Sequence, residues 1–224
     1  MAVIVITGVS TGIGHAASKV LLQNGFEVFG SVRRQEDAAR LSAEFGERFT
    51  PLIFDVTDSR AVAAAAQQVR DALRGQTLAG LVNNAGIAVP GPLVELPVEE
   101  FRQQIEVNLI GPFLVTQAFA PLLGVDRTLA GKPGRIVNIS SVAGQRAMPF
   151  LGSYAASKFG LEGYSEALRR ELLLYGIDVI VIGPGPVKTA IWDKADTVNT
   201  GAYKNSPYAD IIATFSQAFI AQGR

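Results

Sequence analysis

Residues 3–14 read VIVITGVSTGIG, an apolar β-branched run followed at once by a glycine-rich turn. The run at 3–7 predicts a buried strand, and a helix is predicted at 14–23, stopped by Asn24-Gly25. Glycine lets the backbone approach a pyrophosphate closely, and the start of a helix offers it free N–H groups. The spacing differs from G-x-G-x-x-G, yet the strand before it and the helix after it predict a dinucleotide site. Contacts are expected from Gly8, Ser10, Thr11, Gly12, Ile13 and Gly14.

The same turn contains a competing motif, because residues 8–12 match G-x-S-x-G, the nucleophile elbow of serine hydrolases. That fold places its catalytic histidine after the serine in the chain. The only histidine here is His15, in the first turn of the adjoining helix. A Ser-His-Asp triad cannot be assembled, which excludes a hydrolase. We expect a structural or solvent-facing role for His15.

Short apolar runs continue to alternate with longer helical patterns along the chain. Further strands are predicted at 27–32, 49–54, 78–82, 135–140 and 177–182. Helices are predicted at 35–45, 59–74, 98–123, 154–175 and about 210–222, with Asp58 as an N-cap and an irregularity near Gly111-Pro112. Continuously apolar strands separated by helices indicate a parallel sheet covered on both faces. The predicted class is α/β, a Rossmann-like doubly wound parallel sheet flanked by helices on both faces, in a single domain over residues 1–224.

The composition narrows the function. Lys+Arg and Asp+Glu are both 20, so the net charge of zero gives no sign of binding to nucleic acid or to an anionic membrane. The apolar residues 109–125 are broken by two prolines and are expected to form a buried helix rather than a membrane span. With no cysteine and one histidine, disulfides, thiolate chemistry and a metal site are not expected. No targeting segment is visible, and a cytoplasmic location is expected.

Tyr154 and Lys158 form a Y-x-x-x-K pair on one face of a predicted helix. A carbonyl reductase needs an acid that protonates the developing alkoxide. Bringing the pKa of a tyrosine from near 10 to about 7 means favouring the phenolate by roughly 4 kcal/mol. An adjacent ammonium, together with the positive charge of an oxidised nicotinamide, can supply that. Ser141 and the segment 83–86 end neighbouring strands, and Asn108 lies in the following helix, so these groups are expected at the same edge of the sheet.

Together these pieces resemble the short-chain dehydrogenase/reductases over essentially the whole chain. The matching motifs are T-G-x-x-x-G-I-G at 7–14, N-N-A-G at 83–86, V-N-L at 107–109, I-S-S at 139–141, Y-A-A-S-K at 154–158, and Pro184-Gly185 with Thr189. The chain looks similar in particular to members acting on steroids and retinoids and to carbonyl reductases.

The resemblance implies four catalytic residues: Tyr154 as the general acid/base, Ser141, Lys158 and Asn108. Ser141 would bind the substrate oxygen, and Lys158 would bind the nicotinamide ribose and lower the pKa of Tyr154. Asn108 would hold a water that extends a proton relay. The resemblance also implies cofactor contacts from Asp55, Val56, Asn83, Ala85, Gly86, Pro184, Gly185, Val187 and Thr189, while Ser140 is expected only to pack.

The end of the second predicted strand distinguishes the two nicotinamide cofactors. NAD-binding members of such folds place an acid there, whereas this chain has Arg33 and Arg34. Two guanidiniums can grip a 2′-phosphate. We therefore expect NADP(H), with NAD(H) as the alternative cofactor.

The residues expected to rim the nicotinamide are apolar and predict a hydrophobic ketone, aldehyde or alcohol as the substrate. They are Val89, Pro90, Leu93, Met148, Pro149, Phe150 and Trp192. A substrate lid is expected at about 186–224, and the family pattern leads us to expect a homodimer or homotetramer. Family members usually continue into a seventh strand, so a truncated chain and a shortened natural form both stay open. The alternative function is a non-catalytic NAD(P)-binding sensor, but its signature, loss of Tyr154, Lys158 or Ser141, is not seen.

Overall fold

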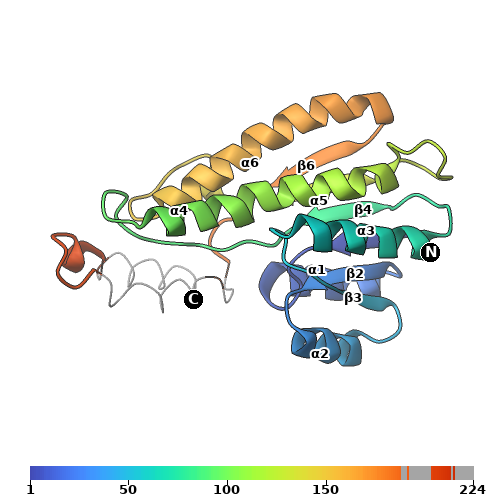
Figure 1. The fold of residues 1–224 in the computed structure, drawn as a ribbon, viewed down its shortest axis with the longest axis horizontal. Coiled ribbons are helices and arrows are strands. Elements are labelled where there is room, and N and C mark those ends of the chain that lie inside the picture. Colours follow the sequence, from blue (N-terminus) through green and yellow to red (C-terminus); the bar gives the residue numbers. More distant parts are fainter. Residues whose placement is uncertain (188–190, 192–202, 213, 215–224) are drawn as a thin grey trace.

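A computed structural model describes residues 1–187, 191, 203–212 and 214 of the chain (Figure 1). These residues form one parallel sheet in the order β3-β2-β1-β4-β5-β6. Its strands are β1 (Val3–Ile6), β2 (Glu27–Val32), β3 (Phe49–Ile53), β4 (Gly80–Asn83), β5 (Arg135–Ile139) and β6 (Asp178–Ile182). The strand order reverses between β1 and β4, and ligands of doubly wound folds bind at that point, outside the carboxyl ends of the strands. The predicted fold class is confirmed.

Six helices connect or flank the strands: α1 (Gly12–Gln23), α2 (Gln35–Phe45), α3 (Ser59–Leu73), α4 (Val98–Ile105), α5 (Gly111–Phe119) and α6 (Gly152–Glu171). Single turns of 3-10 helix cover Ala120–Leu123, Val142–Gly144 and Leu172–Tyr175. The predicted N-cap of α3 is confirmed, since the Asp58 carboxylate accepts from the backbone N–H groups of Arg60 and Ala61, both at 3.0 Å. Of the helix predicted at 210–222, residues 213 and 215–222 lie outside the described residues, as does most of the expected lid.

Helices cover both faces of the sheet because alternate residues of its strands point to opposite sides. Val3 and Val5 of β1 pack in one buried cluster with α3 and α5. Ile4 and Ile6 pack in a second cluster with α1 and α2. In Figure 1, α6 runs along the top of the molecule, and α2 lies at the bottom, below β2 and β3. The two clusters fix the sheet between its helices and leave the carboxyl ends of the strands open to form a site.

The helix predicted at 98–123 is interrupted near Gly111-Pro112, as expected. The irregularity is a π-helical turn over Glu106–Ile110, immediately before Gly111-Pro112, and Asn108 is buried within it. A π turn adds one residue to the ordinary helical repeat, and such turns occur frequently at functional sites. Pro112 fits just after the turn because a proline in the first turn of a helix needs no N–H partner.

By length and composition alone, Val98–Leu123 could cross a membrane, although a core helix passes the same test. Val115, Phe119 and Leu123 are fully buried in the cluster that α3 and the sheet share. The segment therefore serves as a core helix, as the sequence predicted.

Candidate active site

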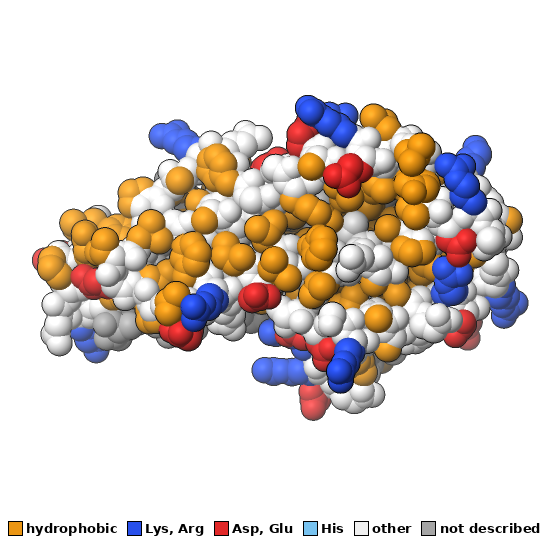
Figure 2. All heavy atoms as spheres, turned by 45° about the horizontal axis from the view of Figure 1, so that its top comes forward, with side chains coloured by type: hydrophobic (Ala, Val, Ile, Leu, Met, Phe, Trp, Pro, Cys, Tyr) orange, Lys and Arg blue, Asp and Glu red, His pale blue; other side chains and the backbone are white. Residues whose placement is uncertain are grey.

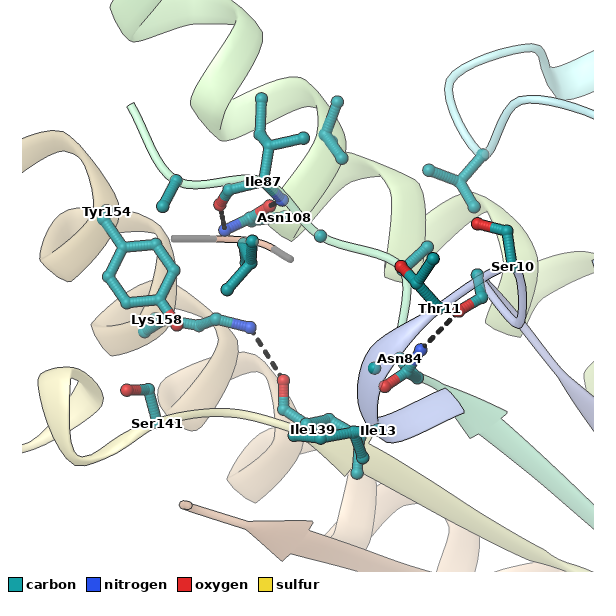
Figure 3. A pocket seen from close by; sticks show the side chains of 18 of the residues that line it. Ser10, Thr11, Ile13, Asn84, Ile87, Asn108, Ile139, Ser141, Tyr154 and Lys158 are labelled. Carbon is teal, nitrogen blue, oxygen red and sulfur yellow. Dashed lines mark hydrogen bonds between the residues drawn. The ribbon is translucent and has the colours of Figure 1, made fainter. Parts of the chain in front are cut away.

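A cavity of about 510 Å³ lies at the carboxyl ends of β1, β4 and β5, a size typical of small-molecule sites (Figure 3). It brings together most of the residues predicted from the sequence. The predicted residues that line it are Gly8, Ser10, Thr11, Gly12, Ile13, Arg33, Asp55, Val56, Ala85, Gly86, Asn108, Ser141, Tyr154, Lys158, Pro184, Gly185 and Val187. Gly14, Arg34 and Asn83 are not among the lining residues, and Thr189 lies outside the described residues.

The glycine turn is built so that no side chain fills the space in front of α1. Gly8 and Gly12 have φ values of 70° and 63°, which favour glycine. A Cβ on Gly8 would lie 2.8 Å from the Cα of Ala85. A Cβ on Gly14 would meet the Asn84 side chain and the Gly8 carbonyl, so this glycine serves the packing of α1. The free N–H groups at the start of α1 therefore face a hollow that accepts an anion.

The expectation for Asn83 is wrong in its location, because its side chain points away from the cavity. Its Nδ2 donates to Asn138 Oδ1 at 2.8 Å and to Thr116 Oγ1 at 3.1 Å, and the residue is fully buried. Asn84, the next residue, lines the cavity instead, and its Nδ2 donates to the carbonyls of Thr7 and Gly8 at 2.8 and 2.9 Å. Asn83 thus links β4 to β5 and α5, whereas Asn84 holds the glycine turn.

Tyr154 lies on α6 facing Ser141, which follows β5 (Figure 3). Burial raises the pKa of the Tyr154 hydroxyl, and a hydrogen bond with the Ser141 side chain acts in the opposite direction. The expected lowering of the tyrosine pKa is therefore not a property of the site without cofactor, because burial outweighs the hydrogen bond. Ser141 is held in place by the backbone N–H of Ala143, which donates to its Oγ at 3.1 Å.

Lys158 is buried one helical turn from Tyr154, and its Nζ lies 5.7 Å from the centre of the tyrosine ring. The Nζ donates to the carbonyl of Ile139, the last residue of β5, at 2.7 Å (Figure 3). Burial lowers the pKa of Lys158 to about 8, and the nearby Glu162 carboxylate acts against that lowering. The ammonium is therefore poised to change its charge close to neutral pH.

Asn108 holds the segment that follows β4. Its Oδ1 accepts from the N–H of Ile87 at 2.9 Å, and its Nδ2 donates to the Ile87 carbonyl at 3.0 Å and to Ser157 Oγ at 3.2 Å. Figure 3 shows the pair beside the cavity. The π-helical turn thus places a buried carboxamide between Ile87 and α6, and its binding of a catalytic water stays a prediction.

The far end of the cavity carries a pair of opposite charges. Arg33 Nη1 lies 3.7 Å from Asp55 Oδ2, while Asp55 Oδ1 accepts from the backbone and hydroxyl of Thr57 at 3.0 and 2.8 Å. Arg33 lies at the end of β2, where a cation is expected to meet a 2′-phosphate. Arg34 is exposed at the N-terminus of α2.

Several lining residues were not predicted, above all Glu100 and Gln103 of α4. Counting back from the motif residue Asn108 in steps of four leads to Gln104, which is buried outside the lining, as well as to Glu100, so the helical repeat does not single out the lining residues. Of the apolar residues expected at the rim, Val89 lines the cavity; Pro90, Leu93, Met148, Pro149 and Phe150 do not, and Trp192 lies outside the described residues.

His15 and Ser140 were the two residues for which we expected no catalytic role. His15 lies outside the cavity wall, with its Nε2 2.9 Å from Glu44 Oε1. Ser140, expected only to pack, is buried but lines the cavity, and its hydroxyl has no hydrogen-bond partner in the part of the chain that the structure describes.

Comparison with known proteins gives consistent matches. The family model described as short chain dehydrogenase matches residues 2–199. The NADPH-dependent 3-dehydrocapnine reductase of Ornithobacterium rhinotracheale is 43% identical over 214 residues, which are 96% of this chain and 75% of that protein. Retinol dehydrogenase 16 of Homo sapiens is 39% identical over 190 residues, 84% of this chain but only 58% of that protein. A solved structure described as ElxO with NADP bound is 26% identical, with a TM-score of 0.78, and the match covers 88% of this chain and 79% of that one.

Proposed function

The chain belongs to the short-chain dehydrogenase family, and from that membership we propose the reaction that it catalyses. It is an oxidoreductase that transfers a hydride between NADP(H) and a hydrophobic ketone or aldehyde, or the corresponding alcohol. The observation that carries the proposal is the meeting of Tyr154, Ser141 and Lys158 in the cavity that the glycine turn enters. The apolar lining residues Ile87, Ala88 and Val89 favour a hydrophobic substrate.

The residues present fit a dinucleotide. Residues of the glycine turn line the cavity beside the start of α1, whose free N–H groups favour a phosphate. The cofactor is NADP(H), in agreement with the NADPH-dependent relative and with Arg33 at the end of β2. Arg33 would hold the 2′-phosphate, and Asp55 and Val56 would lie near the adenine.

Tyr154 supplies the proton in the proposed reduction. The bound reduced nicotinamide supplies a hydride to the carbonyl carbon. Because burial raises the pKa of Tyr154, its hydroxyl carries a proton at neutral pH and can donate it to the carbonyl oxygen. The products of this step are the alcohol, the oxidised cofactor and a tyrosine phenolate, and the phenolate regains a proton from solvent. In the oxidation direction the phenolate removes the proton of the alcohol.

Ser141 and Lys158 assist Tyr154 in different ways. The hydrogen bond from Ser141 favours the phenolate, as does the positive charge of Lys158 near the ring. Lys158 would also donate to the nicotinamide ribose, in exchange for its bond to the Ile139 carbonyl. A water held at Asn108 would link Lys158 to solvent and return the proton.

We also propose that the protein forms a homodimer or homotetramer. Phe113 of α5 and Phe159 of α6 are 43% and 47% exposed. Figure 2 shows hydrophobic side chains gathered on the face that carries these two helices. Exposed apolar patches of this kind mark protein interfaces. The cytoplasmic location and the lid at 186–224 stay predictions.

The test is the loss of NADPH absorbance with a panel of hydrophobic ketones and aldehydes. Tyr154→Phe should lower turnover by at least about 100-fold, because it removes the general acid. Tyr175→Phe is the matched control, since Tyr175 ends the 3-10 turn that follows α6 and does not line the cavity. Turnover that survives unchanged in Tyr154→Phe would refute the mechanism. Bound NADPH without turnover of any carbonyl would favour the non-catalytic sensor.

A further inference from the structure

The charged side chains of the cavity wall find partners, with one exception. Arg33 pairs with Asp55 at 3.7 Å, and Lys158 donates to the Ile139 carbonyl at 2.7 Å. Glu100 also lines the cavity. Within the described ranges 1–187, 191, 203–212 and 214, its carboxylate has no ion pair or hydrogen bond. Glu100 is therefore the charged lining residue whose carboxylate is available to a ligand.

Two nearby carboxylates, those of Glu95 and Glu99, do have partners, so the lack of a partner is particular to Glu100. Glu95 accepts a hydrogen bond from Ser206 Oγ at 3.0 Å. Glu99, the residue directly before Glu100, is 75% exposed and lies 3.2 Å from Arg102 Nη1. Both face away from the cavity wall, whereas Glu100 is half-buried in it.

The Glu100 carboxylate acts electrostatically on Tyr203, which packs on the segment that follows β4. Glu100 is in the first turn of α4. Its charge reaches Tyr203, because burial raises the pKa of that hydroxyl and the Glu100 and Glu95 carboxylates raise it further. Tyr203 packs on Gly91, where an added Cβ would lie 2.6 Å from its hydroxyl oxygen. The segment 87–91 thus connects the Glu100 end of the cavity to Asn108, which binds Ile87.

We propose that Glu100 selects substrates in which a protonated amine accompanies the reacting carbonyl or alcohol group on an otherwise apolar skeleton. A half-buried carboxylate has lost part of its hydration, and a cationic nitrogen restores the lost interaction through a charge-assisted hydrogen bond. An anionic ligand would meet repulsion at the same point. The apolar residues 87–89, which line the same cavity, would contact the apolar skeleton. The inference rests on the proposed function and narrows its substrate class.

Binding of three ligands of equal chain length tests the inference. Octylammonium, 1-octanol and octanoate are titrated into the NADPH-saturated protein, and binding is read from the fluorescence of the bound NADPH. Octylammonium should bind about tenfold more tightly than 1-octanol, the gain of one charge-assisted hydrogen bond, and octanoate most weakly. Glu100→Gln should remove the difference between the ammonium and the alcohol. Glu100→Lys should reverse the order in favour of octanoate.

Glu99→Gln is the matched control, because it removes a carboxylate one residue away, outside the cavity. This variant should keep the preference of the wild-type protein. Equal affinity of the three ligands in the wild-type protein, no binding of octylammonium at millimolar concentration, or a preference that persists in Glu100→Gln would each overturn the inference. Failure of the proposed function is separate, since it would appear as bound NADPH that no carbonyl compound oxidises.

Discussion

Lys158 and Tyr154 respond to burial in the same sense, since each is driven toward its neutral form. Burial lowers the pKa of Lys158 to about 8 and raises that of Tyr154. The Glu162 carboxylate on the same helix favours the Lys158 ammonium, which also donates to the Ile139 carbonyl of β5. The protein without cofactor is therefore suited to keeping a proton on Tyr154. Stabilising the phenolate requires the additional positive charge that an oxidised nicotinamide brings.

Glu162→Gln should make cofactor binding more sensitive to alkaline pH. The Glu162 carboxylate raises the pKa of Lys158, so its removal should bring that pKa below about 8. If the ammonium form binds the cofactor, affinity for NADPH is constant at low pH and falls as the pH rises through the Lys158 pKa. The midpoint of that fall should move down by up to about one pH unit in the variant. Fluorescence titrations of NADPH across this pH range measure it.

The control for this prediction is Glu166→Gln, one turn further along α6. Glu166 pairs with Arg169 and Arg170 on the surface, at 3.1 and 2.6 Å. Its loss should leave the pH dependence unchanged. A midpoint that moves equally in both variants would mean that Glu162 does not act on Lys158.

Arg33→Asp should weaken NADPH much more than NADH. The wild-type guanidinium is 67% exposed and held only loosely by Asp55, so it is free to turn to a 2′-phosphate. A carboxylate there would repel the phosphate of NADPH but could accept from the ribose hydroxyls of NADH. The ratio of the two dissociation constants should change by at least about tenfold. An equal loss for both cofactors would remove Arg33 from the 2′-phosphate site.

The connection between α3 and the turn that follows α5 depends on one carboxylate. Asp126 lies 2.9 Å from Arg70 of α3 and accepts from the backbone and hydroxyl of Thr128 at 3.0 and 2.7 Å. The hydrogen bonds from Thr128, followed by the one from Arg70, lower the pKa of Asp126 from 3.8 to about 2. Its contribution to stability is therefore fully present above pH 3.8 and is lost as the pH falls toward 2.

Asp126→Asn should accordingly be less stable than the wild-type protein at neutral pH, and the difference should shrink as the pH falls from 3.8 toward 2. Urea unfolding of both proteins over that range is the measurement. Asp178→Asn, which removes an exposed partner of Arg135, should cost less at neutral pH. A gap between wild-type and Asp126→Asn that stays constant with pH would show that the ionised carboxylate is not the stabilising form.

Elements with strong local signals were predictable from the sequence. The bounds of α2 are those expected, and Gly46 ends the helix with a φ of 74°. The π-helical turn could not be located, because one extra residue changes the apolar period too little to be seen in a single sequence. Gly111-Pro112 indicated an irregularity nearby, and the structure shows its kind and its bounds, a π-helical turn at Glu106–Ile110.

Some residues of the candidate site could likewise be predicted from the sequence, and others could not. Motif residues such as Ser141 and Tyr154 were predictable because strand ends meet at one edge of a parallel sheet. Glu100 was not, since a carboxylate in the first turn of a helix is also favourable in solvent. We expected Asn83 at the cofactor, although residues alternate along β4 and Asn83 therefore points to the same side as the core residue Leu81. Tertiary packing decides which polar neighbour enters a cavity.

In solution, we expect the protein to have at least twice the mass of its 23.7 kDa chain. The double variant Phe113→Glu/Phe159→Glu places two charges on the exposed face of α5 and α6 and should convert it to monomers. Val20→Glu is the control, because Val20 is 55% exposed on α1. Light scattering after size-exclusion chromatography gives the masses. A wild-type monomer, or a double variant that still associates, would contradict the assembly through these helices.

The π-helical turn limits how the length of this chain can vary. A helix rotates by about 100° per residue, so the additional residue of the turn offsets the facing of α4 from that of α5. With the offset, α4 directs Glu100 toward the cavity while α5 directs Val115 and Phe119 into the core. Deleting one residue between 106 and 110 would restore a regular helix and misalign one half with its neighbours. Surface loops can gain or lose residues, but a residue gained or lost at this turn would rotate α4, which lines the cavity, relative to α5, which packs in the core.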